Sequence, residues 1–529
     1  MEKRKQKKLM VISILLGVFV VLLLTANLTT SYLIKQKVDK ELALLPAEFG
    51  EISCGSIYVR LFSGTAEVND IRYIYHHAKK VHKKDSVAPG IRVSIDQVSV
   101  GHIFYSLLMN KQLVVNSLSI IRPDIDLWLD DKNPLHSFPT FPKSEETTRK
   151  ASFPFHQAQL REFNLEKASV RYHSLRTPLD AKVDSCSLSV YHLSYDSAFH
   201  YCDSLYNFAL EHAALKTPDG MMLIETHNIE QEDAGPLTIG RTHIMNTVSH
   251  TEMAERANEP ITWLDMHMAS AKIGAFNPVR KILAQDWTFG EITAVVNKMN
   301  VVRDLTHKPL KPYRMLQEEM MAIPVPFRVA KINGEIKKLT INLALTPTKC
   351  GKMSLEKIHA SIANLTNARG AIMMVSGGMP LGEGNASVGI NLTMNDDSDF
   401  TMRMVGQNAD MSFINEFIQP IAGLKLNCAV DRLDLENVGN KVKTTGTFCL
   451  QYHDLEVLEN QFSGFANAIL PKRNPNNDKS EPRAYKTEWK KEPKQEFAFY
   501  LFGPMIDGVI KTLLPGVNVH QQIRYKPVE

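Results

Sequence analysis

Two aspartates stand two residues apart in the segment RPDIDLWLDD, Arg122–Asp131, a spacing that puts side chains on one face of a β-strand. Asp124 and Asp126 therefore share a face if this segment is a strand, and Asp130 lies on the same face. Paired carboxylates can act as a general acid and a general base. An exposed polar strand face gives the same pattern, and we therefore assign these aspartates no catalytic role.

Ordinary structure also explains the other groups that could do chemistry. Glu211 and His212 are consecutive residues in a strand pattern, so their side chains point to opposite faces of the sheet and make a poor acid–base pair. His76, His77 and His82 could gather a metal ion, but no carboxylate or cysteine stands at ligand spacing, and the lysines around them indicate a solvated loop. The glycine-rich residues 376–387 fit neither dinucleotide- nor phosphate-binding spacing and predict turns between strands. We predict that the protein is not an enzyme and uses no cofactor and no metal ion.

The elements that carry these residues are mostly strands, and one layout occurs twice. The segments Ser106–Lys132 and Lys281–Lys308 start about 175 residues apart. Each begins with a short apolar, helix-like turn (Leu107-Leu108 in the first), runs through two β-rich stretches and ends in charged residues. A Pro-Phe pair follows each copy, at Pro154-Phe155 and Pro326-Phe327. Two matches in the same order predict a diverged internal duplication.

The apolar residues of the first copy change phase part-way along it. Before the change the apolar residues stand at even-numbered positions, Leu118 and Ile120, and after it they stand at odd-numbered positions, Ile125, Leu127 and Leu129. The change falls at Ile121–Pro123, and a proline inside a strand marks an edge or a break. We therefore expect a bulge or kink at this step.

These patterns predict a mainly β chain, a β-rich α+β fold. We expect an N-terminal transmembrane helix and then an elongated, curled antiparallel β-sheet of repeated units with short helices between them. A sheet must bury its apolar face, and few helices are predicted to cover it, so the sheet is expected to curl into a trough open to an apolar ligand. An ordinary sandwich of two sheets would alternate in the same way.

The expected boundaries follow composition and periodicity. Near the C-terminus, apolar residues recur at helical spacing, which predicts an amphipathic helix that either docks on the sheet or contacts a bilayer or partner. The predicted parts are a basic tail (1–8), a transmembrane anchor (9–30), a first β-rich unit (31–250), a second β-rich unit (251–470), a charged loop (471–495) and a C-terminal amphipathic helix with a tail (496–529).

The first residues carry the whole net charge of the chain. The formal net charge is +4, and residues 1–8 hold five basic residues and one acid. The rest of the chain therefore lacks the basic footprint of a nucleic-acid binder. The uncharged segment Leu9–Ile34 follows, and about 20 apolar residues suffice to cross a bilayer. Because positive flanks stay in the cytoplasm, we predict an anchor with a cytoplasmic N-terminus. A cleaved signal peptide is the alternative, although LTANLTT is a poor match to a cleavage site.

Six cysteines in an exported chain raise the question of disulfides. Cys428 and Cys449 stand at equal distances from the centre of a predicted hairpin turn, Asn437–Asn440. The alternation of apolar residues around them requires a register that sends the two thiols to opposite faces. We therefore expect buried free thiols, with a disulfide as the alternative.

The order of these features resembles the AsmA-like family of Gram-negative envelope proteins. The basic N-terminus and single anchor match, and so do strand patterns at Gly55–Ile74, Ser94–Asp131, Ile323–Leu345, Gly351–Asn367, Gly446–Leu458 and Ile469–Asn477. The match covers most of the chain, but it is a pattern of strands and turns without a catalytic signature. The resemblance implies a periplasmic, membrane-anchored protein whose β-rich part curls into an apolar groove. Large relatives are thought to conduct phospholipids between membranes, and this chain is smaller.

We therefore expect a single-pass protein of the inner membrane, with the bulk of the chain in the periplasm, that binds or transfers phospholipid or another lipid and supports outer-membrane assembly. One alternative is a structural or assembly factor whose sheet edges pair with client proteins, and another is an anchored envelope hydrolase that depends on Asp124 and Asp126. The candidate groove residues, for which plain sheet core is the alternative, are Leu118, Ile120, Ile125, Leu127, Leu129, Val295 and Val301.

Overall fold

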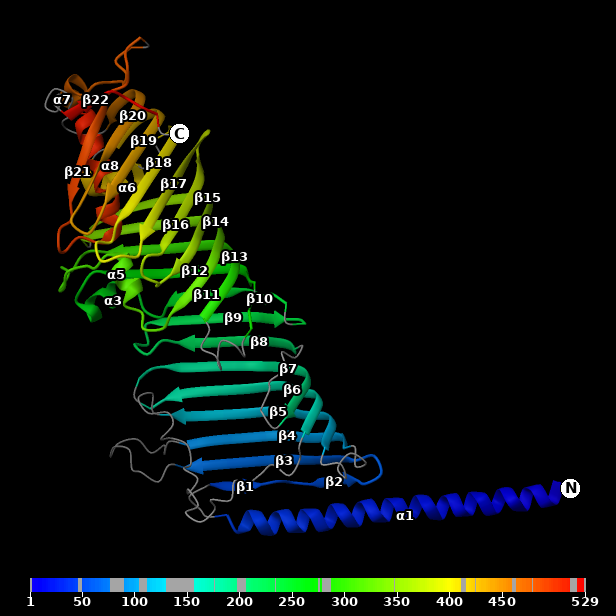
Figure 1. Cartoon of the computed structure of the whole chain (residues 1–529). Helices are drawn as coiled ribbons and strands as arrows, with labels where there is room; N and C mark the ends of the chain where they lie inside the picture. The colour runs from blue at the N-terminus through cyan, green and yellow to red at the C-terminus, as the bar shows by residue number, and fades with distance from the viewer. Residues whose placement is uncertain are drawn as a thin grey trace. The chain divides into compact units, whose positions relative to one another are not determined.

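A computed structural model gives the structure of the chain (Figure 1). It describes residues 2–45, 50–76, 90–103, 112–129, 157–175, 177–196, 206–233, 235–274, 276–277, 287–346, 348–410, 415–423, 425–458, 463–477, 479–513 and 521–527. The side chains of residues 2–22, and of a few others within these ranges, lie outside the description. The helix-like turns expected at 107–108 and 282–283, Pro154-Phe155 and the loop histidines at 77 and 82 also lie outside it.

The chain divides into two compact units, residues 1–234 and residues 235–529, and both are mainly β. Unit 1 begins with one long helix and continues with a sheet whose strands neighbour each other in chain order from β3 onward. Its elements are α1 (Glu2–Ala43), β1 (Glu51–Ser53), β2 (Ile57–Arg60), β3 (Thr65–His76), β4 (Gly90–Ile103), β5 (Gln112–Leu129), β6 (Gln157–Ser174), β7 (Asp180–Asp196), β8 (Tyr206–Lys216) and β9 (Met222–Gln231).

The last turns of α1 protect the edge of this sheet. The Ser31 hydroxyl accepts a hydrogen bond from the Val59 backbone N–H at 2.8 Å, and the Asn27 side chain accepts one from the Leu61 N–H at 3.1 Å. These bonds occupy edge groups of β2 that would otherwise be open to another strand. Within the part of the chain that the structure describes, no helix is both long enough and apolar enough to cross a membrane. The side chains of residues 9–22, most of the predicted anchor, lie outside that part.

The expectation of a purely antiparallel sheet is wrong. Among the pairings described within each unit, β5 runs parallel to β6, and β13 (Trp287–Asp304) runs parallel to β14 (Phe327–Thr346), whereas the others are antiparallel. In both cases the chain returns to the same end of the sheet before the next strand begins, which makes the pair parallel. β5 and β13 are both 18 residues long, start 175 residues apart and hold the same place in the pairing order. This topology agrees with the predicted duplication.

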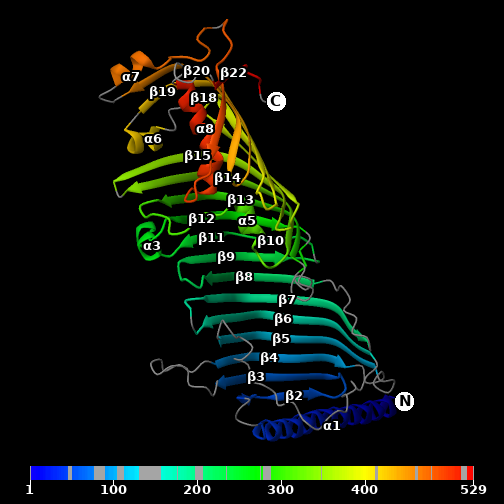
Figure 2. The same cartoon turned by 60° about the vertical axis from the view of Figure 1, so that its left-hand side comes forward.

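A row of irregular residues crosses unit 1 at the predicted kink. Arg122 of β5 has φ 47° and lies opposite Asp96, while Asp70 and Lys167, next in the row on β3 and β6, have φ 53° and 52°. Such angles are uncommon for residues other than glycine and interrupt the alternation of a strand. Because the irregular residues of neighbouring strands stand at paired positions, the strands stay in register on both sides of the kink. Strands β5–β7 visibly bend near one end (Figures 1 and 2).

Unit 2 has a sheet covered by helices. Its strands are β10 (Leu237–Ile239), β11 (Thr242–Asn246), β12 (Ile261–Ile273), β13, β14, β15 (Lys349–Thr366), β16 (Ile372–Leu381), β17 (Gly384–Thr393), β18 (Phe400–Asp410), β19 (Lys425–Gly439), β20 (Lys443–Leu458), β21 (Ala484–Lys490) and β22 (Gln522–Ile523). Its helices are α3 (His250–Ala257), α5 (Leu316–Met321), α6 (Asn415–Ala422), α7 (Ser463–Ile469) and α8 (Phe497–Leu513).

The predicted C-terminal helix is α8, and it docks on β20 and β21 (Figure 2). Tyr500 is fully buried there, with its ring edge-on to Phe400 at 5.9 Å and its hydroxyl donating to the Asn440 carbonyl at 2.7 Å. The buried core around it includes Leu435 and Phe448, which are 0% and 1% exposed. Docking on the sheet, one of the two predicted roles of this helix, is therefore confirmed.

Two local predictions near the C-terminus need correction. Strand β21 lies inside residues 471–495, which were expected to form a charged loop, because Tyr485, Thr487 and Trp489 alternate with its charged residues and pair with β20. The β19–β20 turn lies at residues 440–442 rather than at 437–440.

This shift of the turn separates the two candidate disulfide cysteines. Cys449 pairs with Asp434, six positions along β19 from Cys428. Neither cysteine forms a disulfide and both are buried, as predicted.

Candidate functional site

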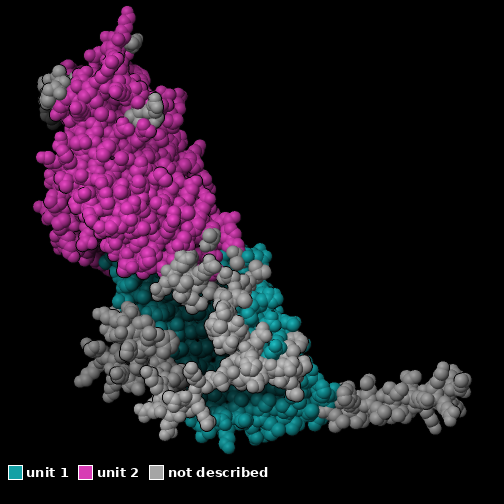
Figure 3. All heavy atoms as spheres, in the orientation of Figure 1, with its two compact units in different colours: residues 1–234 teal, residues 235–529 magenta. Residues whose placement is uncertain are grey.

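In its described residues, unit 1 is a single layer of strands with no second layer over its apolar face. Among the described residues, α1 packs on β1 and β2 and no helix packs on β4–β9. The large buried core cluster belongs to unit 2 alone. Figure 3 shows the surface of unit 1 in teal, with a recessed part of it in view. A sheet of this kind needs another layer, a partner or a ligand to remove its apolar side from water.

The five groove candidates of unit 1 all lie on β5. The kink at Arg122 reverses the alternation, so the residues before it and those after it come to the same face; we call this set, Leu118, Ile120, Ile125, Leu127 and Leu129, the β5 apolar face. Leu129 is 5% exposed, whereas the other four remain partly exposed. Neighbouring strands extend the set, since Ile91 on β4 and Tyr172 on β6 both pair with Leu127.

The aspartates of β5 lie on the opposite, polar face and are held in ion pairs. Arg171 on β6 donates to the Asp124 carboxylate at 2.9 Å and also donates to Asp126. The hydrogen bonds from Arg171 to Asp126 and Asp124 raise the pKa of its guanidinium. Arg92 adds a second cation 3.8 Å from Asp126 and lies over the ring of Trp128. Both carboxylates are thus engaged by a structural cation.

The groove candidates of unit 2, both on β13, lie in different surroundings. Val295 lies beside Thr293 in the lining of a hollow formed by β13–β19, with a volume of about 950 Å³. Val301 is not part of this lining and pairs with Leu264 and Ile341 on the neighbouring strands.

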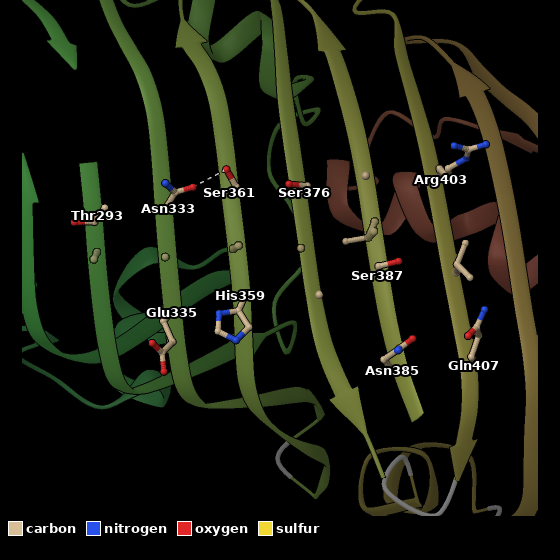
Figure 4. A pocket seen from close by; sticks show the side chains of 18 of the residues that line it. Thr293, Asn333, Glu335, His359, Ser361, Ser376, Asn385, Ser387, Arg403 and Gln407 are labelled. Atoms are coloured by element: carbon tan, nitrogen blue, oxygen red, sulfur yellow. Dashed lines mark hydrogen bonds between the residues drawn. The ribbon is translucent and has the colours of Figure 1, made fainter. Parts of the chain in front are cut away.

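The hollow of unit 2 has a mixed lining of small apolar residues and polar side chains and lies on the face of the sheet away from α8 (Figure 4). Its middle strands carry small residues, including Ser376, Gly378 and Gly389, and a Cβ added at Gly389 would meet no atom within 4 Å. Longer side chains stand on either side: Glu335 and His359 come from β14 and β15, and Asn385, Arg403, Gln407 and Arg432 come from β17–β19. The small residues therefore form the floor and the long polar residues the rim.

The charges at the rim are partly compensated. Arg432 donates to Asp434 at 2.7 Å, and this hydrogen bond raises the pKa of the guanidinium. Arg403 lies 4.0 Å from Glu436, a looser and half-exposed pair. The guanidiniums, amides and hydroxyls of this lining can bind a polar or anionic group, and its valines and small residues supply apolar surface beside them.

Sequence reasoning did not find this hollow. The glycine-rich residues 376–387 do contain a turn, with Gly382 at φ 63°, but Gly377 and Gly378 lie within β16. Glycines at two adjacent strand positions were the available signal, since glycine inside a strand often marks a place where something approaches the backbone closely.

Comparison with known proteins identifies no relative. No family model, no curated protein and no solved structure matches this chain.

Proposed function

We propose that this chain is a membrane-attached envelope protein of the AsmA-like type, which binds or transfers lipid through the β5 apolar face of unit 1. The observation that carries the proposal is the apolar side of a single-layer sheet on which no described helix packs beyond β1 and β2, in contrast to the helix-covered core of unit 2. Burial of apolar area contributes roughly 25 cal/mol per Å². Acyl chains lying along this face would remove from water the area that no described element covers.

A second group of exposed apolar residues supports membrane attachment. Leu24 and Leu28 of α1 are 57% and 65% exposed, and Phe62, in the turn after β2, is 73% exposed. The hydrogen bonds from β2 to α1 hold these two segments together. Apolar side chains gathered beside an N-terminal helix fit the interface of a bilayer better than water.

The proposal is tested by native mass spectrometry of the full chain, purified in mild detergent from a Gram-negative host. We expect co-purified phospholipid in the wild-type protein and its loss in Leu127→Asp, since a carboxylate on the apolar face is costly to desolvate. Ser119→Asp, on the polar face of the same strand, is the matched control and should keep the lipid. Circular dichroism and a thermal melt establish that both variants are folded.

The opposite result would favour the assembly-factor alternative. A wild-type chain that is free of lipid after gentle purification, or equal lipid retention in the Leu127 and Ser119 variants, contradicts binding at this face. A chain that instead co-purifies with envelope proteins would favour pairing of its sheet edges with client strands.

A further inference from the structure

Two histidines and an aspartate meet on adjacent strands at the start of unit 2. His243 on β11 lies directly opposite His267 on β12, and Asp265 is two residues before His267 and therefore on the same face. One ligand atom from each of the three lies within 4.8 Å of the other two, and within the described part of the chain no other group of histidine, cysteine or carboxylate side chains meets this condition. Sequence reasoning did not find this set, because its members come from two strands.

The spacing of the three ligand atoms is close to what a metal ion requires. Asp265 Oδ1 lies 2.6 Å from His243 Nε2 and 3.4 Å from His267 Nε2. Ligand atoms about 2.0–2.2 Å from a tetrahedral zinc ion stand about 3.4 Å apart. One of the two spacings already has this value, and the other needs to open by less than about 1 Å.

We propose that His243, Asp265 and His267 form a zinc-binding site in which both Nε2 atoms and one carboxylate oxygen hold the ion. Imidazole and carboxylate ligands suit Zn²⁺. Three protein ligands leave a fourth position open to water. The site would tie the short strand β11 to β12. It does not depend on the lipid-binding function proposed for unit 1.

The surroundings of the site both support and limit the affinity. Asn300 on β13 donates to the other carboxylate oxygen of Asp265 at 3.4 Å, which orients Oδ1 toward the imidazoles. Lys298 places a positive charge near the ion, and the stacked imidazoles, with centroids 4.0 Å apart, must splay to bind it.

The test is a zinc titration of the full chain in mild detergent, after treatment with a chelator and dialysis, in competition with a chromophoric indicator. We expect one ion per chain, bound with a dissociation constant in the micromolar range or below. His243→Gln and His267→Gln should each weaken binding at least tenfold, and Asp265→Asn should weaken it as well. In the wild-type protein, Co²⁺ should give the visible absorption of a tetrahedral site.

The chain supplies a matched control in unit 1. His212 and His227 also face each other on neighbouring strands, with Asp184 paired to His212, but these three do not meet the spacing condition. His212→Gln should leave the zinc affinity unchanged. Absence of 1:1 binding by the wild type, wild-type affinity in both His243→Gln and His267→Gln, or an equal loss in His212→Gln would each overturn the proposal. X-ray absorption of the zinc-loaded wild type, with two imidazole ligands expected, decides the matter if the variants do not fold.

Discussion

Gly508 is a place where α8 lies close against the sheet, and replacing it with alanine tests how tightly the helix covers unit 2. A Cβ at this position would lie 2.2 Å from Cγ and 2.4 Å from Cδ1 of Phe448. Carbon atoms ordinarily rest about 3.5–4.0 Å apart, so the helix or the ring must move by about 1.5 Å. Phe448 is 1% exposed and has little room to move.

The expected effect of Gly508→Ala is a lower free energy of unfolding. Overpacking a core costs about 1–3 kcal/mol, and the better helix propensity of alanine offsets up to about 1 kcal/mol of this. With the full offset, we expect a net loss of up to about 2 kcal/mol, measured by urea unfolding of the full chain. Hydrogen exchange should also become faster in peptides from α8.

A matched substitution separates the contact from the helix propensity. Gly464 is also helical, in α7, and an added Cβ there meets nothing within 4 Å. Gly464→Ala should therefore be neutral or stabilise by up to about 1 kcal/mol. Equal stability of Gly508→Ala and the wild type, with unchanged exchange in α8, would refute the close packing of this helix.

Three further predictions concern reactivity, acid stability and backbone strain. Burial raises the pKa of the Cys449 thiol to about 12, whereas Cys350 is exposed, so iodoacetamide at pH 8 should alkylate Cys350 and spare Cys449, as read by peptide mass mapping. Burial raises the pKa of Asp304, but hydrogen bonds, including one from His250 at 3.0 Å, outweigh this effect and leave the pKa below its ordinary value. The ionised Asp304 should therefore stabilise the fold above about pH 4, and this stability should be lost as the pH falls through the lowered pKa. Asp304→Asn should flatten that part of a plot of urea stability against pH. Lys167 has φ 52°, so Lys167→Gly should stabilise unit 1 by up to about 1 kcal/mol, and a clear loss in thermal unfolding would contradict the strain.

The strands and the kink were predictable because they depend on local patterns. The change of phase between Ile120 and Ile125 marks the bend at Arg122, since each apolar residue must stay on one face of the sheet. The β8–β9 turn is also encoded locally, in Pro218-Asp219-Gly220, where Asp219 accepts a hydrogen bond from the Met221 N–H and Gly220 has φ 70°. Alternation and turn residues record such features directly.

Features that depend on long-range placement were not predictable in the same way. Strand direction follows from where the connection returns the chain, so alternation could not tell that β6 runs parallel to β5 and β14 parallel to β13. Asn437 looked like a turn residue but is 1% exposed within β19, where it accepts from Thr487 on β21. The hollow and the His243–Asp265–His267 set each need residues from separate strands, which only the pairing brings together.

The central claim, that the β5 apolar face of unit 1 binds lipid, is tested most directly by photocrosslinking in living Gram-negative cells. A photoreactive amino acid replaces Leu127 in one strain and Ser119, on the opposite face of the same strand, in the other. After illumination, we expect mass spectrometry of the purified chain to find lipid adducts at position 127 and none at position 119. Adducts at neither position, or equal adducts at both, would contradict lipid binding at this face.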